Sequence, residues 1–393
     1  MWTMTAYLTR RLSRVALVGG AAVAAMVLSA CGNGLASGGG GQSDNGPIVL
    51  GMLTPLSGSS SAIGPYMKNG AQLAVDEING KGGVNGRKLQ LKVEDEACDA
   101  KSATAGANKL VTDGVKISVG GYCSGATLPT LPIFEKAGVP MLIPAANSNE
   151  LVKQHKKNVF LINGTGVQQS DAALKFMKKE GATKVALMDD NTSYSKDIAD
   201  TTAKLLTGSP ALAGRESVTA GESDYSANVN AILKSQPDFI YWTGYYQEGG
   251  LIIRQLRQAG YTGKIMVADG SVDQKLVDIA GPAVAEGVFA TMTQTPDTLQ
   301  GADTWIADYK SKFGADPGPY STQAYDAVRV AAEAVKQAGS TDGDAVIKAL
   351  EGIDGFQLFS GPLKFTPDHT LTSGGFQILV VENGKIVLKD TLQ

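Results

Sequence analysis

The chain has 393 residues, of which 43% are hydrophobic and 19% are charged. Its 35 lysines and arginines nearly balance 38 aspartates and glutamates, which gives a formal net charge of -3 at pH 7. This length exceeds the usual size of one hydrophobic core, so we expect two domains. The charge balance excludes the concentrated basic face that nucleic acid binding requires.

The start of the chain has the pattern of an export signal. Arg10, Arg11 and Arg14 form a basic segment, and a run of apolar and small residues follows at positions 15–28. Such a run is too short to span a membrane comfortably, and it has the length of the hydrophobic region of a signal peptide. Residues 1–30 are therefore predicted to be an export signal that is removed from the mature protein.

A cysteine motif ends this signal. The sequence Leu28-Ser29-Ala30-Cys31 resembles the lipobox of bacterial lipoproteins, in which the cysteine is lipid-modified and becomes the first residue after cleavage. The alternative is an ordinary secretory signal that happens to contain a cysteine. Residues 31–46 are rich in glycine and cannot bury enough apolar surface to fold, so we expect a flexible tether. The prediction is an extracytoplasmic protein, anchored to the cell membrane through a lipid on Cys31.

Strands and helices alternate through the rest of the chain. Residues 48–53 are predicted to form a buried strand, and Ala71, Ala74, Val75 and Ile78 have the spacing of one buried helix face. This alternation favours parallel, doubly wound sheets, and the number of strands requires two of them. The further predicted segments are strands at 89–93, 117–121, 139–143, 184–189, 238–242 and 264–268, a helix at 101–111, and a hairpin of 376–381 with 386–389 around Asn383-Gly384.

Six short sequence blocks follow one another between positions 76 and 287. They are Asp76-Glu77-Ile78-Asn79, Gly82-Gly83-Val84-Asn85-Gly86, Asp95-Glu96-Ala97-Cys98-Asp99, Gly120-Gly121-Tyr122-Cys123-Ser124, Pro144-Ala145-Ala146-Asn147, and Ile279-Ala280-Gly281 with Ala285-Glu286-Gly287. In this order they resemble the periplasmic binding proteins of the branched-chain amino acid (leucine, isoleucine, valine) family. The resemblance implies an α/β fold of two Rossmann-like, doubly wound lobes, the periplasmic binding protein type I fold, joined by a three-segment hinge.

The resemblance also implies a division of the chain and a function. It places the hinge segments near residues 164–167, 292–294 and 363–373. The first lobe would comprise residues 47–165 plus 293–365, and the second 166–292 plus 366–393. We expect a monomer that binds an amino acid, of branched-chain type or an analogue, between the lobes, closes about the hinge and delivers the amino acid to the permease of an ABC importer. No cofactor, metal or enzymatic activity is expected.

The candidate residues for binding the carboxylate of an amino acid lie in two loops of the first lobe. Ser124 matches a family serine that binds this carboxylate, and the segment Ala145, Ala146 and Asn147 matches one that supplies backbone groups and a side chain. The family commonly has threonine or serine where Asn147 stands. Capping of helices or turns is the alternative role for Ser124 and Asn147.

For the ammonium group, the resemblance points to Asp269, although relatives usually carry glutamate there. A turn formed by Asp269-Gly270 is the alternative. Aromatic residues are expected to enclose the ligand, with core packing as their alternative role. Ile63 falls where relatives often have tyrosine or tryptophan, so the first-lobe wall would be more aliphatic. The residues expected to line the site in this way are Tyr122, Tyr194, Tyr245, Tyr320 and Ile63.

The family resemblance implies a disulfide between Cys98 and Cys123, with free buried thiols as the alternative. Such a bond would fix the loop that carries Ser124. We expect that closing a loop of this length adds about 3 to 4 kcal/mol of stability on a chain-entropy estimate.

Two other functions remain open from the sequence. A membrane-anchored sensor would use the same fold and closure. A surface hydrolase is disfavoured, because the serine in Gly121-Tyr122-Cys123-Ser124-Gly125 is one place late for a nucleophile elbow. His155 and His369 lack the spacing of metal ligands. The acidic run Glu94-Asp95-Glu96 is predicted to be a solvated edge rather than a catalytic pair, because adjacent strand residues point to opposite faces.

Overall fold

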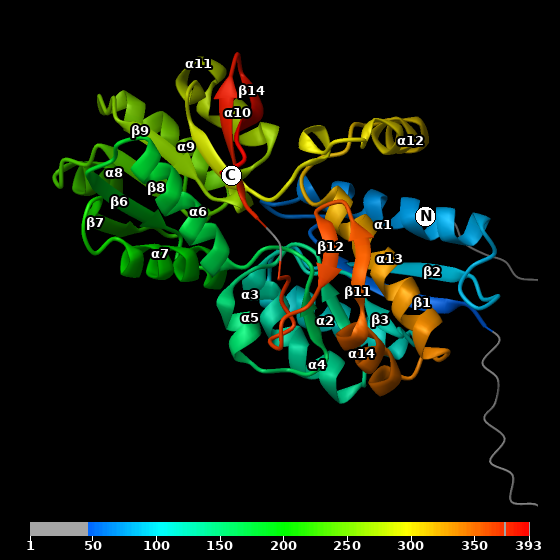
Figure 1. The fold of residues 1–393 in the computed structure, drawn as a ribbon. Coiled ribbons are helices and arrows are strands. Elements are labelled where there is room, and N and C mark those ends of the chain that lie inside the picture. The colour runs from blue at the N-terminus through cyan, green and yellow to red at the C-terminus, as the bar shows by residue number, and fades with distance from the viewer. Residues whose placement is uncertain (1–45, 373–374, 393) are drawn as a thin grey trace, which may run out of the picture. The chain divides into compact units, whose positions relative to one another are not determined.

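A computed structural model describes residues 46–372 and 375–392 (Figure 1). The predicted signal peptide, Cys31 and the tether up to residue 45 lie outside the described residues. Within the described part of the chain, no helix combines the length and the apolar character needed to cross a membrane.

The first sheet has five strands in the order β2-β1-β3-β4-β5, all parallel. Each strand is followed by at least one helix, as expected for a doubly wound sheet. The strands are β1 (Ile48–Thr54), β2 (Leu89–Asp95), β3 (Ile117–Ser118), β4 (Met141–Ile143) and β5 (Val159–Leu161). The helices between them are α1 (Ile63–Gly80), α2 (Ala100–Thr112), α3 (Ser124–Thr127), η1 (Leu128–Thr130), α4 (Leu131–Lys136) and α5 (Asn149–Lys153).

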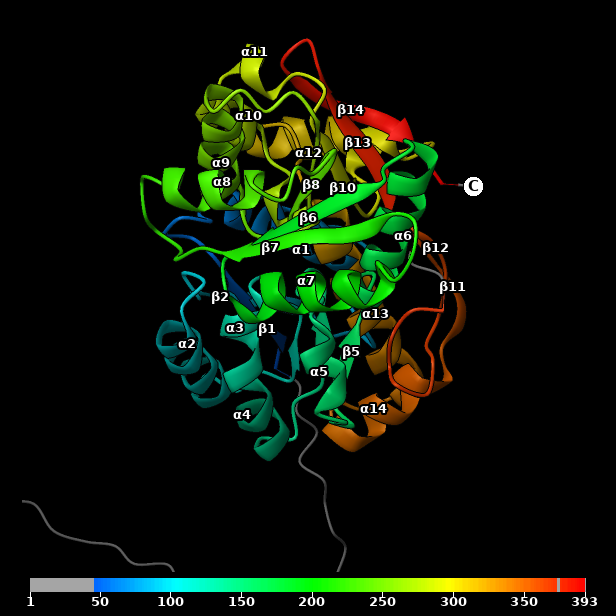
Figure 2. The same cartoon turned by 90° about the vertical axis from the view of Figure 1, so that its left-hand side faces the viewer.

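The second sheet has seven strands in the order β14-β13-β10-β9-β8-β6-β7. Its strands are β6 (Lys184–Asp189), β7 (Ala211–Ser217), β8 (Phe239–Trp242), β9 (Lys264–Val267), β10 (Phe289–Met292), β13 (Gln377–Glu382) and β14 (Lys385–Asp390). The last two form the predicted hairpin and are antiparallel. The helices are α6 (Gly166–Lys179), α7 (Ser193–Leu205), α8 (Ser226–Leu233), α9 (Tyr246–Gln258), η2 (Asp269–Ser271), α10 (Gln274–Ala280) and α11 (Pro282–Ala285). Figure 2 shows this sheet and its helices from the side.

After β10 the chain returns to the first sheet. The elements of this stretch are η3 (Pro296–Thr298), α12 (Asp303–Phe313), α13 (Ser321–Ala338), α14 (Gly343–Gly352), and the hairpin of β11 (Asp354–Leu358) with β12 (Gly361–Lys364). Helix α13 packs along α1 (Figure 1). The two helices approach closely at Gly70, where an added Cβ would lie 2.0 Å from the carbonyl oxygen of Ser321. Glycine is therefore required at this crossing.

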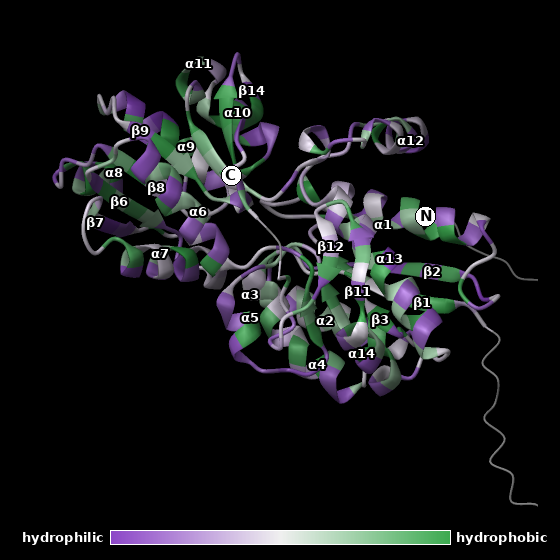
Figure 3. Ribbon diagram, in the orientation of Figure 1, coloured by the Kyte–Doolittle hydropathy of each residue, from purple (hydrophilic) through white to green (hydrophobic). Residues whose placement is uncertain are grey.

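The strands of both sheets are mostly apolar, and the helices beside them alternate between apolar and polar segments (Figure 3). Central strand residues such as Met52, Leu142, Leu187 and Ile240 are fully buried. This pattern is that of parallel strands covered on both faces. The predictions of an α/β class and of two sheets are confirmed.

Residues 365–371 lie within the predicted third hinge segment, residues 363–373. Residues 365–371 remain against β5: Phe365 bridges Leu371, and the Leu161 N–H donates to the His369 carbonyl oxygen at 2.9 Å. The His369 ring also stacks on Phe160, with ring centroids 4.0 Å apart. This stacked histidine and its backbone bond hold residues 366–371, which the predicted division assigns to the second lobe, beside the first sheet.

Candidate functional site

Loops at the carboxyl ends of strands from both sheets meet at Asp269. Asp269 follows β9 of the second sheet, and Asn147 follows β4 of the first. The Asn147 Nδ2 donates a hydrogen bond to the Asp269 Oδ2 at 3.1 Å. Both side chains are buried, with exposed fractions of 0% and 1%. The two sheets therefore share one buried polar cluster at the edge where ligands of such folds bind.

Two tyrosine hydroxyls complete the surroundings of Asp269. The Tyr194 hydroxyl donates to Oδ1 at 2.5 Å, and the Tyr320 hydroxyl donates to Oδ2 at 2.8 Å. Tyr194 comes from α7 of the second sheet, whereas Tyr320 precedes α13 of the first. Burial raises the pKa of both hydroxyls well above its usual value, so both remain protonated donors.

Asp269 has a raised pKa. Burial raises the pKa of its carboxyl group, although the hydrogen bonds from Tyr194 and Tyr320 oppose this shift. The donors that the structure shows around the carboxylate are uncharged hydroxyls and one amide. A buried carboxylate with neutral partners is complemented by a cation such as an ammonium group, which favours the ionised form.

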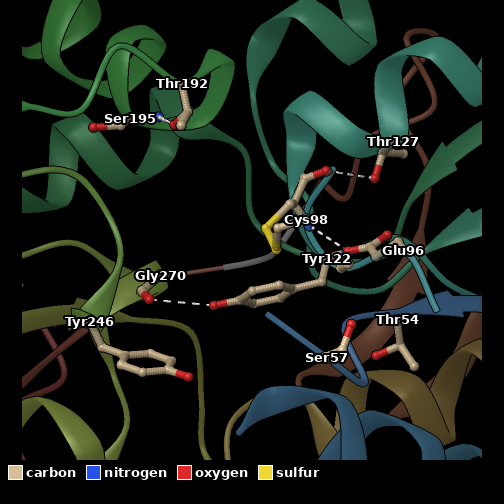
Figure 4. The surroundings of a disulfide bond; sticks show 12 residues. Thr54, Ser57, Glu96, Cys98, Tyr122, Thr127, Thr192, Ser195, Tyr246 and Gly270 are labelled. Atoms are coloured by element: carbon tan, nitrogen blue, oxygen red, sulfur yellow. Dashed lines mark hydrogen bonds between the residues drawn. A yellow bond between two sulfur atoms is a disulfide. The ribbon is translucent and has the colours of Figure 1, made fainter. Parts of the chain in front are cut away.

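Four aromatic rings surround this cluster. Tyr122 lies 5.9 Å from Tyr245 and 5.5 Å from Tyr320 between ring centroids, and Tyr194 lies 5.0 Å from Tyr245. The Tyr122 hydroxyl donates to the carbonyl oxygen of Gly270 at 3.4 Å, across from one sheet to the other (Figure 4). The structure thus brings together all four tyrosines that the sequence singled out. Their rings form a largely apolar wall, and the hydroxyls of Tyr194 and Tyr320 are directed at the Asp269 carboxylate.

Ser124 lies in a neighbouring loop of the first sheet. It begins α3, and its Oγ accepts the N–H of Ser148 at 3.2 Å. The residue that caps α5 through its side chain is Ser148, which bonds the N–H of Glu150 at 3.2 Å. Capping is therefore the role of Ser148 rather than of Asn147 or Ser124. The Ser124 hydroxyl remains able to donate its own hydrogen to a carboxylate.

The Ala145-Ala146 segment is tied to its own sheet. The Ala146 N–H donates to the Gly121 carbonyl oxygen at 3.1 Å, and the Ala145 carbonyl oxygen accepts the Asn163 Nδ2 at 2.9 Å. These two backbone groups thus support the loop that holds Asn147. Ile63 is 1% exposed and belongs to the hydrophobic core at the start of α1 rather than to the polar cluster.

Gln169 is a site residue that the sequence did not reveal. Its Oε1 accepts the Asn147 Nδ2 at 3.0 Å, and its Nε2 donates to the Thr291 Oγ1 at 2.9 Å. Gln169 lies on α6 and is fully buried. It orients the Asn147 amide toward Asp269, and no sequence signal distinguishes it from a polar residue on the surface of a helix.

Glu96 corrects the prediction of a solvated acidic edge. Its side chain is fully buried beneath the loop of Ser124. The Glu96 Oε1 accepts the N–H groups of Tyr122 at 3.2 Å and Cys123 at 2.9 Å (Figure 4). Burial raises the pKa of this carboxyl group to about 7. The prediction failed because Glu96 lies one residue beyond β2, where the chain turns inward under the neighbouring loop.

The same loop carries a covalent bond. The sulfur atoms of Cys98 and Cys123 are bonded, and their Cα atoms lie 5.2 Å apart. With Glu96, these cysteines are the one group within the described residues that has the spacing of metal ligands. Because the sulfurs are bonded to each other, they are not thiolates, and the group is a structural link rather than a metal centre.

With this geometry established, comparisons with known proteins identify the family. A family model described as "Periplasmic binding protein" matches residues 47–385, and the chain belongs to this family. The family is one of binding proteins rather than enzymes. The chain is 35% identical over 348 residues to the Leu/Ile/Val-binding protein BraC3 of Rhizobium johnstonii, covering 86% of this chain and 93% of that protein. It is 33% identical to the leucine-, isoleucine-, valine-, threonine- and alanine-binding protein of Pseudomonas aeruginosa, covering 84% and 89%.

Solved structures give the same result for the fold. The leucine binding protein LivK of Thermotoga maritima superposes with a TM-score of 0.79 at 27% identity, covering 87% of this chain and 97% of that chain. The substrate-binding protein LivJ of Streptococcus pneumoniae, in complex with isoleucine, has a TM-score of 0.79 at 28% identity, covering 86% and 97%. These likenesses confirm the predicted family and the type I fold. The chain is a solute-binding protein of the class that serves ABC importers of branched-chain amino acids.

Proposed function

We propose that this protein binds leucine, isoleucine or valine at the cluster around Asp269 and delivers it, as a monomer, to an ABC permease. The observation that supports this most directly is the buried Asp269 carboxylate held by Asn147, Tyr194 and Tyr320. It offers one negative group to the ammonium of an amino acid. The hydroxyl of Ser124 is proposed to bind the carboxylate, and the tyrosine rings are proposed to cover the aliphatic side chain.

The site is proposed to lie between two lobes that move about a hinge. The first lobe comprises residues 47–165 and 293–371, and the second comprises 166–292, 372 and 375–392. Contacts such as Asn147 with Asp269 and Tyr122 with Gly270 join loops of the two lobes. A ligand that contacts both sets of loops favours the closed arrangement over the open one.

Isothermal titration with a panel of ligands tests the proposal. Leucine, isoleucine and valine are expected to bind with a stoichiometry of about one. Two analogues separate the roles of the charges: 4-methylpentanoate lacks the ammonium group of leucine, and 3-methylbutylamine lacks its carboxylate. Both are expected to bind at least about 100-fold more weakly than leucine, because each leaves buried polar groups of the site unpaired. Tight binding of 4-methylpentanoate with no binding of leucine would contradict the proposal.

We also propose that the protein is extracytoplasmic and anchored through a lipid on Cys31. In the source cells, Cys31→Ser is expected to abolish incorporation of a labelled fatty acid and to move the protein from the detergent phase to the aqueous phase on Triton X-114 partition. A single acyl chain gives only marginal membrane binding, so an anchor that holds the protein stably requires more than one chain. Cys98→Ser with Cys123→Ser is the matched control, because it removes cysteines while leaving Cys31. Unchanged partition of the Cys31 variant would disprove the anchor.

A further inference from the structure

A buried acid lies behind the loop that is proposed to receive the ligand's carboxylate. Glu96 is fully buried, and one of its oxygens accepts two adjacent backbone N–H groups, those of Tyr122 and Cys123. The other oxygen, Oε2, is buried and has no hydrogen-bond partner. A carboxylate in this position is stabilised on one side only, so its charge is incompletely compensated.

Glu96 is connected to both sides of the proposed site. The residue after its two donors is Ser124, whose Oγ accepts the Ser148 N–H beside Asn147. Tyr122, one of the two donors, reaches Gly270 of the second sheet through its hydroxyl (Figure 4). The Glu96 backbone is itself fixed, because its N–H donates to the Thr54 carbonyl oxygen at 3.2 Å. A change in the charge of Glu96 therefore acts on the loop that carries Ser124.

The groups that face Glu96 do not compensate its charge. Asp95 on the same segment raises the pKa of Glu96. Burial raises the pKa of Tyr122 and of Tyr245, and the charge of Glu96 adds to both shifts. Two further acids, Asp190 and Asp269, also raise the pKa of Tyr245. These neighbours are acids or tyrosines.

We propose that Glu96 is a positioning residue for the loop of Ser124, and that it takes up a proton from solvent when an amino acid binds. This inference rests on the proposed function. The ligand's carboxylate would bring a second negative charge to the loop that Glu96 supports, and repulsion between like charges favours the neutral, protonated form of Glu96. The proton adds to the carboxylate of Glu96 to give the carboxylic acid, and no other bond changes.

The sign of the pH dependence follows from this linkage. If the bound state holds the proton more tightly than the free state, the linkage to Glu96 alone leaves affinity constant below the pKa of free Glu96, about 7, and lowers it as the pH rises through that value. A difference of about half a pKa unit between the two states gives about threefold weaker binding at high pH. A residue that served only to support the fold would not produce this pH profile.

The experiment is titration of the native protein with leucine at pH 6 and pH 8, each in two buffers with different enthalpies of ionisation. Near pH 7, the native protein is expected to take up a fraction of a proton on binding, and its affinity is expected to fall about threefold from pH 6 to pH 8. In Glu96→Gln the uptake and the fall are expected to disappear. Glu94→Gln is the control: it removes an acid on β2 that pairs with exposed Lys109, and it should behave as the native protein does.

Histidine is the residue type that ordinarily titrates near neutral pH, and the chain has two. The double variant His155→Gln/His369→Gln is expected to retain the proton uptake. Loss of the uptake in that variant, or an unchanged uptake in Glu96→Gln, would overturn the inference while leaving leucine binding intact. Absence of leucine binding by the native protein at both pH values would instead overturn the proposed function and this inference with it.

Stability provides a second measurement if Glu96→Gln binds poorly. The pKa of Glu96 rises from 4.5 to about 7 on folding, so its contribution to stability is complete below 4.5 and is lost as the pH rises through 7. Glu96→Gln is therefore expected to raise the melting temperature relative to the native protein more at pH 8 than at pH 5. An equal change at both pH values would contradict a buried, titrating acid.

Discussion

Asp269→Asn is expected to weaken leucine binding about 100- to 1,000-fold, or about 3 to 4 kcal/mol. Asparagine has nearly the same shape as aspartate but no charge, so the proposed ammonium partner would be left buried and unpaired. The amide also cannot accept from Asn147, Tyr194 and Tyr320 in the way that two carboxylate oxygens do. Titration calorimetry with leucine, supported by a thermal melt to show that the variant folds, measures the effect.

Two controls test whether the effect comes from the charge of Asp269 on the ligand's ammonium group. Asp278→Asn changes an exposed acid on α10 and should leave the affinity for leucine unaltered. The analogue 4-methylpentanoate, which has no ammonium group, should bind Asp269→Asn at least as well as it binds the native protein. Equal leucine affinity in Asp269→Asn and the native protein would remove Asp269 from the site.

Asp269 and Glu96 are expected to have opposite effects on binding as the pH changes. An ammonium ligand favours the ionised form of Asp269, whose pKa is raised by burial, so affinity should fall as the pH drops through that raised value. Protonation of Glu96, in contrast, favours binding. Affinity for leucine is therefore expected to be greatest at an intermediate pH, and the acid limb should be absent in Asp269→Asn.

Removal of the disulfide is the second change with a large expected effect. The bond joins residues 25 positions apart, and a loop of this size corresponds to about 3.5 kcal/mol of unfolding free energy on the chain-entropy estimate. Cys98→Ser/Cys123→Ser should therefore lower the denaturant midpoint by an amount that matches this loss. Denaturant unfolding followed by circular dichroism, with and without reductant, measures it.

The reductant provides the internal control for the disulfide. It should destabilise the native protein to the level of the double variant and leave the double variant unchanged. Leucine affinity should also fall in the double variant, because Cys123 lies next to Ser124 and the loop would lose its covalent link to Cys98. Equal midpoints for the oxidised native protein and the double variant would contradict a stabilising bond.

Much of the candidate cluster could be anticipated from the sequence. Asn147 and Asp269 each follow a strand that the hydrophobic pattern had already placed, and parallel strands present their carboxyl ends at one edge of a sheet. Tyr194 and Tyr245 likewise follow β6 and β8. Asn147 and Asp269 lie 122 positions apart, and it was the family resemblance that placed them in one site.

The errors and omissions share one physical cause, which is burial decided by distant contacts. Glu96 has the sequence context of a surface acid, but the loop of Tyr122 and Cys123 covers it. Gln169 has the pattern of an exposed helix residue, but it faces Asn147 and Thr291. His369 lies in a polar turn, yet stacking on Phe160 draws residues 366–371 to the first sheet. Local sequence patterns do not contain these tertiary contacts.

The packing of α13 on α1 has a consequence for how the protein reaches its native state. Helix α1 ends at Gly80, and its partner begins at Ser321, after the whole of β6 to β10 has been made. The edge strand β5 likewise gains its backbone hydrogen bond to His369 only after that turn has been synthesised. The first half of a nascent chain therefore lacks the partners that cover it, and contacts between residues so distant in sequence form slowly. We therefore expect the first sheet to complete its packing only after Ser321 and His369 have been synthesised.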